Sequence, residues 1–276
     1  MSPSLAAGDG GFTYASALSA HQGFLFPQPK DKSKYGLERP MYGYHDIPLR
    51  LEQEGITLSL EQEGENVLYR AVSPTGELEK VLLARAEQVL INPVEPLHKP
   101  KELTSSLLIE FERNLLVEPG ATRTIFVTFP VEIGVFVIGE GSGHEILDVL
   151  TLAVQKFTLY GDPRTGVICK YWSSHISSAP PPVNPLHEGV MELTLINSNT
   201  DWVEVTRAVF NAYGMKIYYS DSLVSMRASM KIMPRRLAET EFLDAPLVPG
   251  MTKSLELYPA RKLPVVPAKF VMEAGL

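Results

Sequence analysis

Residues 125–138 read IFVTFPVEIGVFVI, the stretch with the clearest strand pattern in the chain. Before Pro130, every second residue from Ile125 to Phe129 is apolar and falls on one face of an extended chain, because successive side chains of a strand point to opposite sides. After it, every second residue from Val131 to Val137 is apolar as well. Two consecutive strands are therefore predicted, and the second carries apolar side chains on both faces.

Shorter runs of the same kind lie on both sides of this stretch. Alternating apolar positions occur in residues 56–60, 107–111 and 191–195, and turn sequences such as SPTG (73–76) and EPG (118–120) separate such runs. Period-two segments between turn residues are typical of antiparallel sheet. We therefore predict an all-β fold of two β-sandwich-like, immunoglobulin-like units of antiparallel strands.

The distribution of proline and glycine predicts where the chain divides. Residues 1–40 are rich in Gly, Ser, Ala and Pro and show no strand period, which predicts a flexible N-terminal tail. Residues 179–185 read APPPVNP and predict a stiff linker, since proline cannot donate to a sheet ladder. These features divide the rest into a first β-sandwich domain, 41–178, and a second, smaller one, 186–276.

The composition excludes several classes of protein. The chain has 276 residues, and 45% of them are hydrophobic, which is too high for a chain that is disordered as a whole. A net charge of −7 and a pI near 5.5 argue against nucleic acid as a partner, because such a chain repels phosphate.

No apolar run reaches about 18 residues, and Met1–Gly11 lacks the basic and apolar parts of a secretory signal. We predict a soluble, cytoplasmic protein that is not embedded in a membrane.

Motifs for catalysis, metals and phosphates are weak. Residues 139–143 (GEGSG) lack the last glycine of a dinucleotide loop, and residues 250–254 (GMTKS) lack the glycine before the lysine of a phosphate-binding loop. The six histidines show no zinc-site spacing. The single cysteine, Cys169, lies in an apolar strand-like run, which predicts a small buried side chain rather than a nucleophile. We therefore predict neither a cofactor nor a metal.

Glu132 is the most informative polar residue, because it interrupts a strand with apolar side chains on both faces. A carboxylate buried there requires a basic partner or takes up a proton. Arg70, Lys156 and Lys170 are candidate partners, each in an otherwise apolar strand. Two interpretations are open: a structural ion pair or solvent-exposed edge residue, and a binding or catalytic pocket tuned by this carboxylate.

A second candidate site lies in a predicted hairpin. Residues 149–160 predict a strand, residues 161–166 (GDPRTG) a hairpin loop, and residues 167–172 the returning strand. The two arms carry aromatic and basic side chains: Lys156, Tyr160, Lys170, Tyr171 and Trp172. Such a face can bind a sugar ring or a protein, and a half-exposed sheet surface has the same composition.

Several motifs, taken in order along the chain, resemble one known family. They are MYGY (41–44), PVEP (93–96), FPVEIGV (129–135), KFTLYG (156–161) and FVME (270–273). From residue 41 to residue 276 their order resembles the domain of unknown function 432 family, which is largely archaeal. The resemblance implies no established activity. It does imply a soluble accessory role, with a mechanosensitive channel of small conductance as the protein partner.

The weak motifs favour a non-enzymatic soluble binding or interaction module with an accessory or regulatory role. The alternative is an enzyme or binder of a small polar, sugar-like ligand at a pocket around Glu132, whose further candidate residues are Arg70, Lys156, Tyr160 and Lys170. A homo-oligomer that pairs its edge strands is a third hypothesis. A concave pocket containing Glu132 would favour the alternative, whereas burial of Glu132 against one basic side chain would reduce it to an architectural ion pair.

Overall fold

The computed structural model describes residues 40–83, 85–97, 103–138, 143–152, 154–234, 237–257 and 269–276. Nearly all the regular structure in these residues is strand, with a short 3-10 turn, η1 (Ala212–Gly214), between two strands. This confirms the all-β prediction. No helix in the described ranges is long and apolar enough to cross a membrane. The tail predicted for residues 1–40 lies outside the described residues, apart from Pro40.

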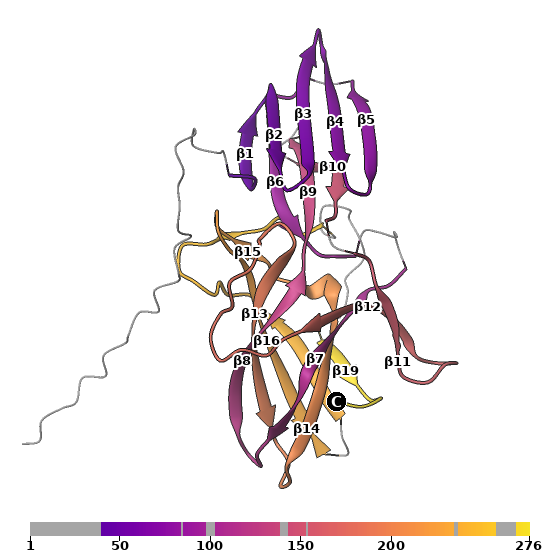
Figure 1. Ribbon diagram of the computed structural model, residues 1–276, viewed down its shortest axis with the longest axis vertical. Helices are drawn as coiled ribbons and strands as arrows, with labels where there is room; N and C mark the ends of the chain where they lie inside the picture. Colours follow the sequence, from indigo (N-terminus) through magenta and orange to yellow (C-terminus); the bar gives the residue numbers. More distant parts are fainter. Residues whose placement is uncertain are drawn as a thin grey trace, which may run out of the picture. The chain divides into compact units, whose positions relative to one another are not determined.

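Two antiparallel four-stranded sheets are built from strands β1 to β6, β9 and β10 (Figure 1). The first has the order β1 (Gly43–Asp46), β6 (Gln88–Val94), β9 (Glu132–Ile138) and β10 (His144–Leu150). The second is a meander of β2 (Leu49–Gln53), β3 (Ile56–Glu63), β4 (Asn66–Ser73) and β5 (Gly76–Leu82). The two sheets are joined by Tyr69 of β4, whose hydroxyl donates a hydrogen bond to Asp148 of β10 at 2.9 Å.

Burial along these strands follows the sequence pattern. In β3, Ile56, Leu58 and Leu60 are buried while the residues between them are partly exposed, as in a strand with one solvent face. β9 differs, because residues 132–136 are all buried. This confirms the prediction that the second strand of the 125–138 stretch is covered on both faces.

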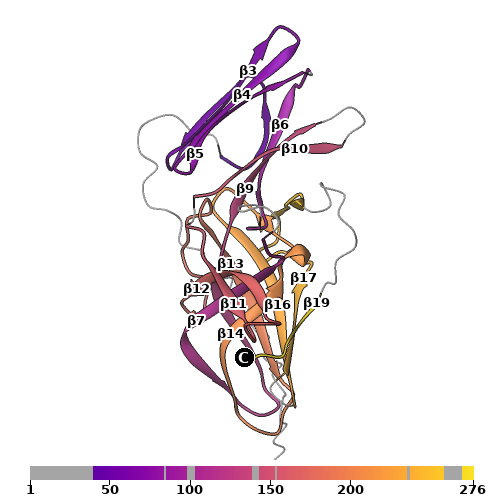
Figure 2. The same cartoon turned by 90° about the vertical axis from the view of Figure 1, so that its right-hand side faces the viewer.

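Two further sheets hold the remaining strands (Figure 2). One has the order β11 (Phe157–Tyr160), β12 (Val167–Ser174), β7 (Ser106–Val117) and β14 (Val203–Asn211). The other has the order β18 (Thr252–Lys253), β15 (Tyr218–Tyr219), β16 (Val224–Met233), β13 (Glu188–Asn197) and β8 (Thr122–Pro130). In this last sheet β17 (Leu237–Leu243) also pairs with β16, and β19 (Lys269–Met272) pairs with β17.

Most strand pairs are antiparallel, as predicted, but two pairs are parallel. β12 runs parallel to β7, and β13 runs parallel to β16. Parallel neighbours cannot be joined by a tight hairpin and need a longer crossover connection. The expectation of antiparallel strands throughout does not hold for these two pairs. The immunoglobulin-like part of the fold prediction stays a prediction.

Side chains join the last two sheets along both sides. On one side, the Ser174 hydroxyl of β12 accepts the Thr128 N–H of β8 at 2.8 Å, and the Trp172 indole donates to the Thr128 hydroxyl at 2.9 Å. On the other side, the Thr240 hydroxyl of β17 donates to the Val209 carbonyl of β14. This bond links the edge strand β14 to the facing sheet.

The sheets cross the predicted boundary between two domains. β7 and β8 precede residue 178, and they pair with β14 and β13, which follow residue 186. Residues 37–276 accordingly form one compact unit. The proline-rich residues 179–185 connect β12 to β13 within this unit, where the Tyr42 hydroxyl donates to the Pro185 carbonyl at 2.8 Å. The division into 41–178 and 186–276 therefore does not follow the sheets.

The predicted hairpin is present, with a shorter first arm than expected. β10 ends at Leu150 and β11 begins at Phe157, so residues 149–160 are parts of two strands rather than one. The loop at residues 161–166 and the returning strand β12 are confirmed. The loop closes where the Gly166 N–H donates to the Asp162 carbonyl at 2.6 Å. A Cβ atom on residue 166 would meet two carbonyl oxygens at 2.6 Å, which explains the glycine.

Candidate functional sites

Glu132 and Lys170 form a buried ion pair between strands of two sheets. Glu132 begins β9, opposite Val94 of β6, and Lys170 lies in β12, opposite Phe157 of β11. The Lys170 Nζ atom is 3.6 Å from Glu132 Oε1, and the two side chains are 2% and 1% exposed. The Lys170 ammonium also lies 5.4 Å from the centre of the Phe157 ring. The structure thus selects Lys170 from the three candidate partners.

Burial opposes the charge of Lys170. Burial lowers the pKa of the Lys170 amine below its usual value. The neighbouring Glu132 carboxylate raises this pKa, but by less than burial lowers it. The 3.6 Å separation is a charge contact that is longer than a good hydrogen bond. A ligand in solvent cannot reach either group, because at most 2% of each side chain is exposed. The arrangement is that of an architectural ion pair.

The other predicted partners of Glu132 lie on the surface. Arg70 of β4 is half exposed and pairs with Glu79 of β5 at 2.7 Å. Lys156 is exposed, and its backbone carbonyl accepts the Tyr171 N–H at 2.9 Å, which extends the β11–β12 ladder. Since both side chains are exposed, neither belongs to the buried pair.

Tyr160 anchors the C-terminal end of the chain. Its hydroxyl accepts the Ala274 N–H at 3.0 Å and donates to the Gly275 carbonyl at 2.9 Å. Its ring packs edge-on against Phe270, with the ring centroids 6.2 Å apart. Burial raises the pKa of the Tyr160 phenol. These contacts give Tyr160 a structural role.

We expect Tyr160→Phe to lower the free energy of unfolding by about 1–2 kcal/mol, because two backbone groups of the C-terminal segment lose their partner while the ring stays. Urea unfolding followed by tryptophan fluorescence measures the difference. Tyr171→Phe is a matched control, since it removes a partly exposed hydrogen bond to Glu110. An equal or larger loss in the control would contradict the anchoring role of Tyr160.

The aromatic and basic side chains of the hairpin do not form one face. Lys170 and Trp172 lie on one face of β12 and Tyr171 on the other, as the period of two requires. On its own face Tyr171 donates to Glu110 at 2.5 Å. Trp172 is turned towards β8 through its hydrogen bond to Thr128. The cluster that was a candidate face for a sugar ring or a protein is therefore divided between two sides of a sheet.

Three exposed apolar side chains lie on the arms of the β11–β12 hairpin. Leu159 and Ile168 are direct cross-strand partners, and they remain 42% and 45% exposed. Val167 lies on the opposite face of β12 and is 39% exposed. The hairpin therefore presents apolar side chains to solvent on both faces.

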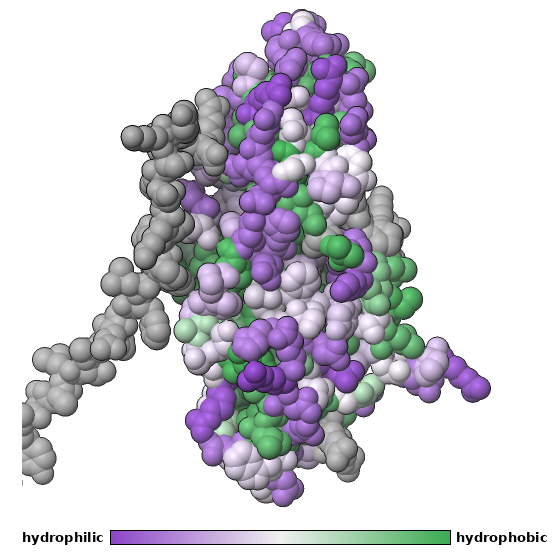
Figure 3. All heavy atoms as spheres, viewed as in Figure 1, coloured by the Kyte–Doolittle hydropathy of each residue, from purple (hydrophilic) through white to green (hydrophobic). Residues whose placement is uncertain are grey.

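Two further exposed apolar residues lie near the two ends of the hairpin. Val154 precedes β11 and is 78% exposed. Leu103 is 41% exposed, and its neighbour Thr104 donates a hydrogen bond to the Ile168 carbonyl, which places Leu103 beside β12. Figure 3 shows hydrophobic surface along the arms of the hairpin. We call this set the hairpin patch: Leu103, Val154, Leu159, Val167 and Ile168.

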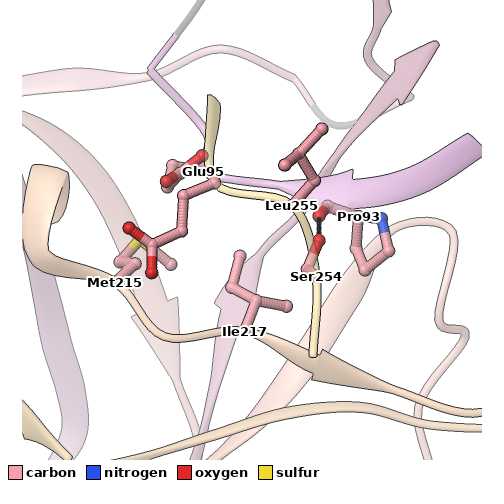
Figure 4. Close-up of a pocket in the computed structure, with 7 residues that line it drawn as sticks. Pro93, Glu95, Met215, Ile217, Ser254 and Leu255 are labelled. Atoms are coloured by element: carbon pink, nitrogen blue, oxygen red, sulfur yellow. Dashed lines mark hydrogen bonds between the residues drawn. The ribbon is translucent and has the colours of Figure 1, made fainter. Parts of the chain in front are cut away.

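A buried carboxyl group that the sequence analysis did not single out lies just after β6 (Figure 4). Glu95 is 1% exposed, and its Oε2 atom accepts the Leu257 N–H at 3.0 Å. Its Oε1 atom has no hydrogen-bond partner among the described residues. Glu95 lines a narrow crevice, together with Pro93, Met215, Ile217, Ser254, Leu255 and Glu256. The crevice is too narrow to hold a water molecule.

Desolvation raises the pKa of Glu95 to about 8. The backbone N–H groups of Glu95 and Leu257 and the charge of Lys216 act in the opposite direction, and the charge of Glu256 adds to the rise. Lys216 does not offset the burial, because it pairs with Glu256 at 2.5 Å. Glu95 is therefore a neutral carboxylic acid at pH 7. The available signal in the sequence was an acidic residue between apolar and proline residues, in PVEP (93–96).

The thiol of Cys169 is buried and holds its proton. Burial raises the pKa of the Cys169 thiol to about 12, which confirms the prediction of a small buried side chain. In the ranges that the structure describes, no group of three His, Cys, Asp or Glu side chains could hold a metal ion.

Comparison with known protein families gives a match over most of the chain. The family described as protein of unknown function (DUF432) matches residues 41–273. This range includes every strand from β1 to β19. No curated protein and no solved structure matches the chain. The family description assigns no activity, so function has to be argued from the geometry of the sites.

Proposed function

This chain belongs to the DUF432 family of proteins of unknown function, and we propose that it is a non-enzymatic binding module that docks a partner protein through the hairpin patch. The accessory or regulatory role and the cytoplasmic location expected from the sequence are part of this proposal. The observation that carries it is the exposed pair Leu159 and Ile168, which face each other across β11 and β12.

An apolar cross-strand pair normally packs against another layer of the same protein. Burying apolar surface is favourable by about 25 cal/mol per Å². Exposed patches of this kind on a folded protein mark interaction sites. β11 is also the edge strand of its sheet and pairs with β12 alone among the described strands. Its free edge offers a partner backbone hydrogen bonds beside the apolar side chains.

The chemistry of the hairpin tip favours a protein partner over a lipid bilayer. The tip, residues 161–166, carries Asp162 and Arg164, and both lie in exposed positions. Insertion of the hairpin into a bilayer would bring these charges to the hydrocarbon first, which is costly. A partner protein can instead cover the apolar arms while the polar tip stays in water.

The alternative function, an enzyme or binder of a small polar ligand around Glu132, has less support. Glu132 and Lys170 are too deeply buried to meet a ligand, and Arg70 and Lys156 are exposed. Tyr160 is occupied by the C-terminal segment. The residues predicted to share one pocket are therefore in three different environments.

Site-specific photo-crosslinking in the native cell tests the proposal. A photo-crosslinking amino acid is placed at Leu159 or at Ile168, and the adducts are identified by mass spectrometry. We expect the same partner protein to be captured from both positions. Val72 and Val81 are matched controls, because they are exposed apolar strand residues (41% and 54%) outside the hairpin patch. No adduct with that protein is expected from the control positions.

Three outcomes would overturn this proposal. Adducts of the chain with itself would make the hairpin patch the interface of a homo-oligomer. Lipid adducts would make it a membrane contact. Equal capture of the same protein from the hairpin and the control positions would show that the contact is unspecific.

A further inference from the structure

The short strand β18 and the residues directly after it are held to the end of β6 by polar contacts. We call residues 252–257 the clasp. Its β18 part pairs with β15 through two residues. Beyond β18, the Ser254 N–H donates to the Ile217 carbonyl at 2.9 Å, and the Ser254 hydroxyl donates to the Pro93 carbonyl. The last contact is the Leu257 N–H, which donates to Glu95 Oε2 at 3.0 Å.

The charged groups near Glu95 are already paired with one another. Lys216 lies 2.5 Å from Glu256, and Lys253 lies 2.7 Å from Asp244 and 3.8 Å from Glu256. Asp244 also accepts the hydroxyl of Tyr218 at 2.7 Å. The crevice side of Glu95 is lined by the apolar side chains of Met215 and Ile217. A negative charge on Glu95 would therefore have backbone N–H groups as its partners, and it would face Glu256 and two apolar residues while Lys216 is paired with Glu256.

We propose that Glu95 is a pH-sensitive latch: its neutral carboxylic acid lets the clasp close over it, and loss of its proton to solvent drives the clasp open. A neutral acid tolerates an Oε1 atom without a hydrogen bond at modest cost. A carboxylate in the same place is a buried charge, and it regains hydration when the segment covering it moves away. The clasp is that segment, because β18 is an edge strand that pairs with β15 through two residues, whereas β6 is paired on both sides, with β1 and with β9.

The direction of the pH effect follows from the two environments of the carboxyl group. The pKa of Glu95 is about 8 with the clasp closed, against 4.5 for the solvated group. A raised pKa in the closed form means that closure is most favoured below about pH 4.5 and is lost as the pH rises towards 8. Between these values the opening equilibrium rises about tenfold per pH unit, and above about pH 8 it is constant.

Opening of the clasp has a structural consequence for the crevice. Met215 and Ile217 are 0% and 3% exposed with the clasp closed. Release of Ser254 from the Ile217 carbonyl uncovers both side chains. The latch thus converts a change in pH between about 6 and 8 into exposure of an apolar surface. This surface is separate from the hairpin patch, so the latch and the proposed function stand or fall independently.

Hydrogen–deuterium exchange of the full chain tests the latch. The amides of Ser254 and Leu257 report on the clasp, and amides of β3 and β16 serve as internal references. After correction for intrinsic exchange, we expect protection of the two clasp amides to fall by roughly 10- to 100-fold between pH 6 and pH 8. Between pH 8.5 and pH 9.5 the corrected protection should be constant. The reference amides should show no such fall.

Two variants test the role of Glu95. Glu95→Gln keeps the size of the side chain without an ionisable group, so clasp protection should no longer depend on pH. Glu79→Gln is the control, because Glu79 is an exposed residue of β5 that pairs with Arg70; it should keep the fall in protection because Glu95 still titrates. The proposal is overturned if the wild-type clasp amides follow the reference amides at every pH, or if Glu95→Gln keeps the full dependence. Should Glu95→Gln fail to fold, the wild-type comparison decides alone.

Discussion

Glu132→Gln is expected to lower the free energy of unfolding by about 3–5 kcal/mol, because it leaves the Lys170 amine buried without its carboxylate. Lys170→Met is expected to cost a similar amount, since Glu132 then loses its cation. Both side chains are at most 2% exposed, so water cannot take the place of the missing partner. Chemical denaturation at pH 7 measures each loss.

The double variant Glu132→Met/Lys170→Met distinguishes an architectural pair from two unrelated buried groups. Replacing both charges with apolar side chains of similar size removes the desolvation penalty together with the attraction. We expect the double variant to be more stable than either single variant. Losses that simply add would show that the two residues are not coupled and would contradict this account of the 3.6 Å contact.

Gly189→Ala is the second change with a large expected effect, a loss of about 3 kcal/mol. Gly189 of β13 lies directly opposite Phe129 of β8. A Cβ atom at residue 189 would lie 2.4 Å from Phe129 Cζ and 2.9 Å from the backbone oxygen of Val224. The Phe129 ring is fully buried and the oxygen belongs to a central strand, so neither can move aside cheaply.

Gly143→Ala is the matched control for this substitution. Nothing lies within 4 Å of a Cβ atom at Gly143, and its backbone does not require a glycine. We expect a change within about 0.5 kcal/mol. Thermal and urea unfolding of the two variants provide the comparison. A Gly189→Ala variant as stable as the control would mean that β8 and β13 pack less tightly than the register indicates.

The strands of this fold were predictable because each carries its own period. The stretch 125–138 indicated two strands without any knowledge of the neighbours, and it left burial of Glu132 and an exposed edge position as alternatives. The basic partner of Glu132 could be identified only from the structure. Lys156 and Lys170 lie on the same hairpin, and only Lys170 is buried. The parallel pairing of β7 with β12 cannot be predicted from the sequence of either strand, because it depends on the path of the chain between them.

The domain division and the Glu95 latch were beyond sequence reasoning for different reasons. The prolines of residues 179–185 correctly mark a segment outside the ladders, but whether such a segment separates domains depends on which strands pair across it. Glu95 needed contacts with residues far along the chain, since Leu257 and Ser254 complete its surroundings. A single acidic residue beside prolines does not reveal such contacts.

The affinity of the purified chain for the protein captured by photo-crosslinking is the most direct test of the proposed function. Leu159→Ser/Ile168→Ser removes the exposed cross-strand pair, and Val72→Ser/Val81→Ser removes matched apolar side chains outside the hairpin patch. With both variants folded, we expect Kd to rise at least about tenfold for the hairpin variant, which corresponds to about 1.4 kcal/mol, and to stay unchanged for the control. An unchanged Kd in the hairpin variant would contradict the assignment of binding to the hairpin patch.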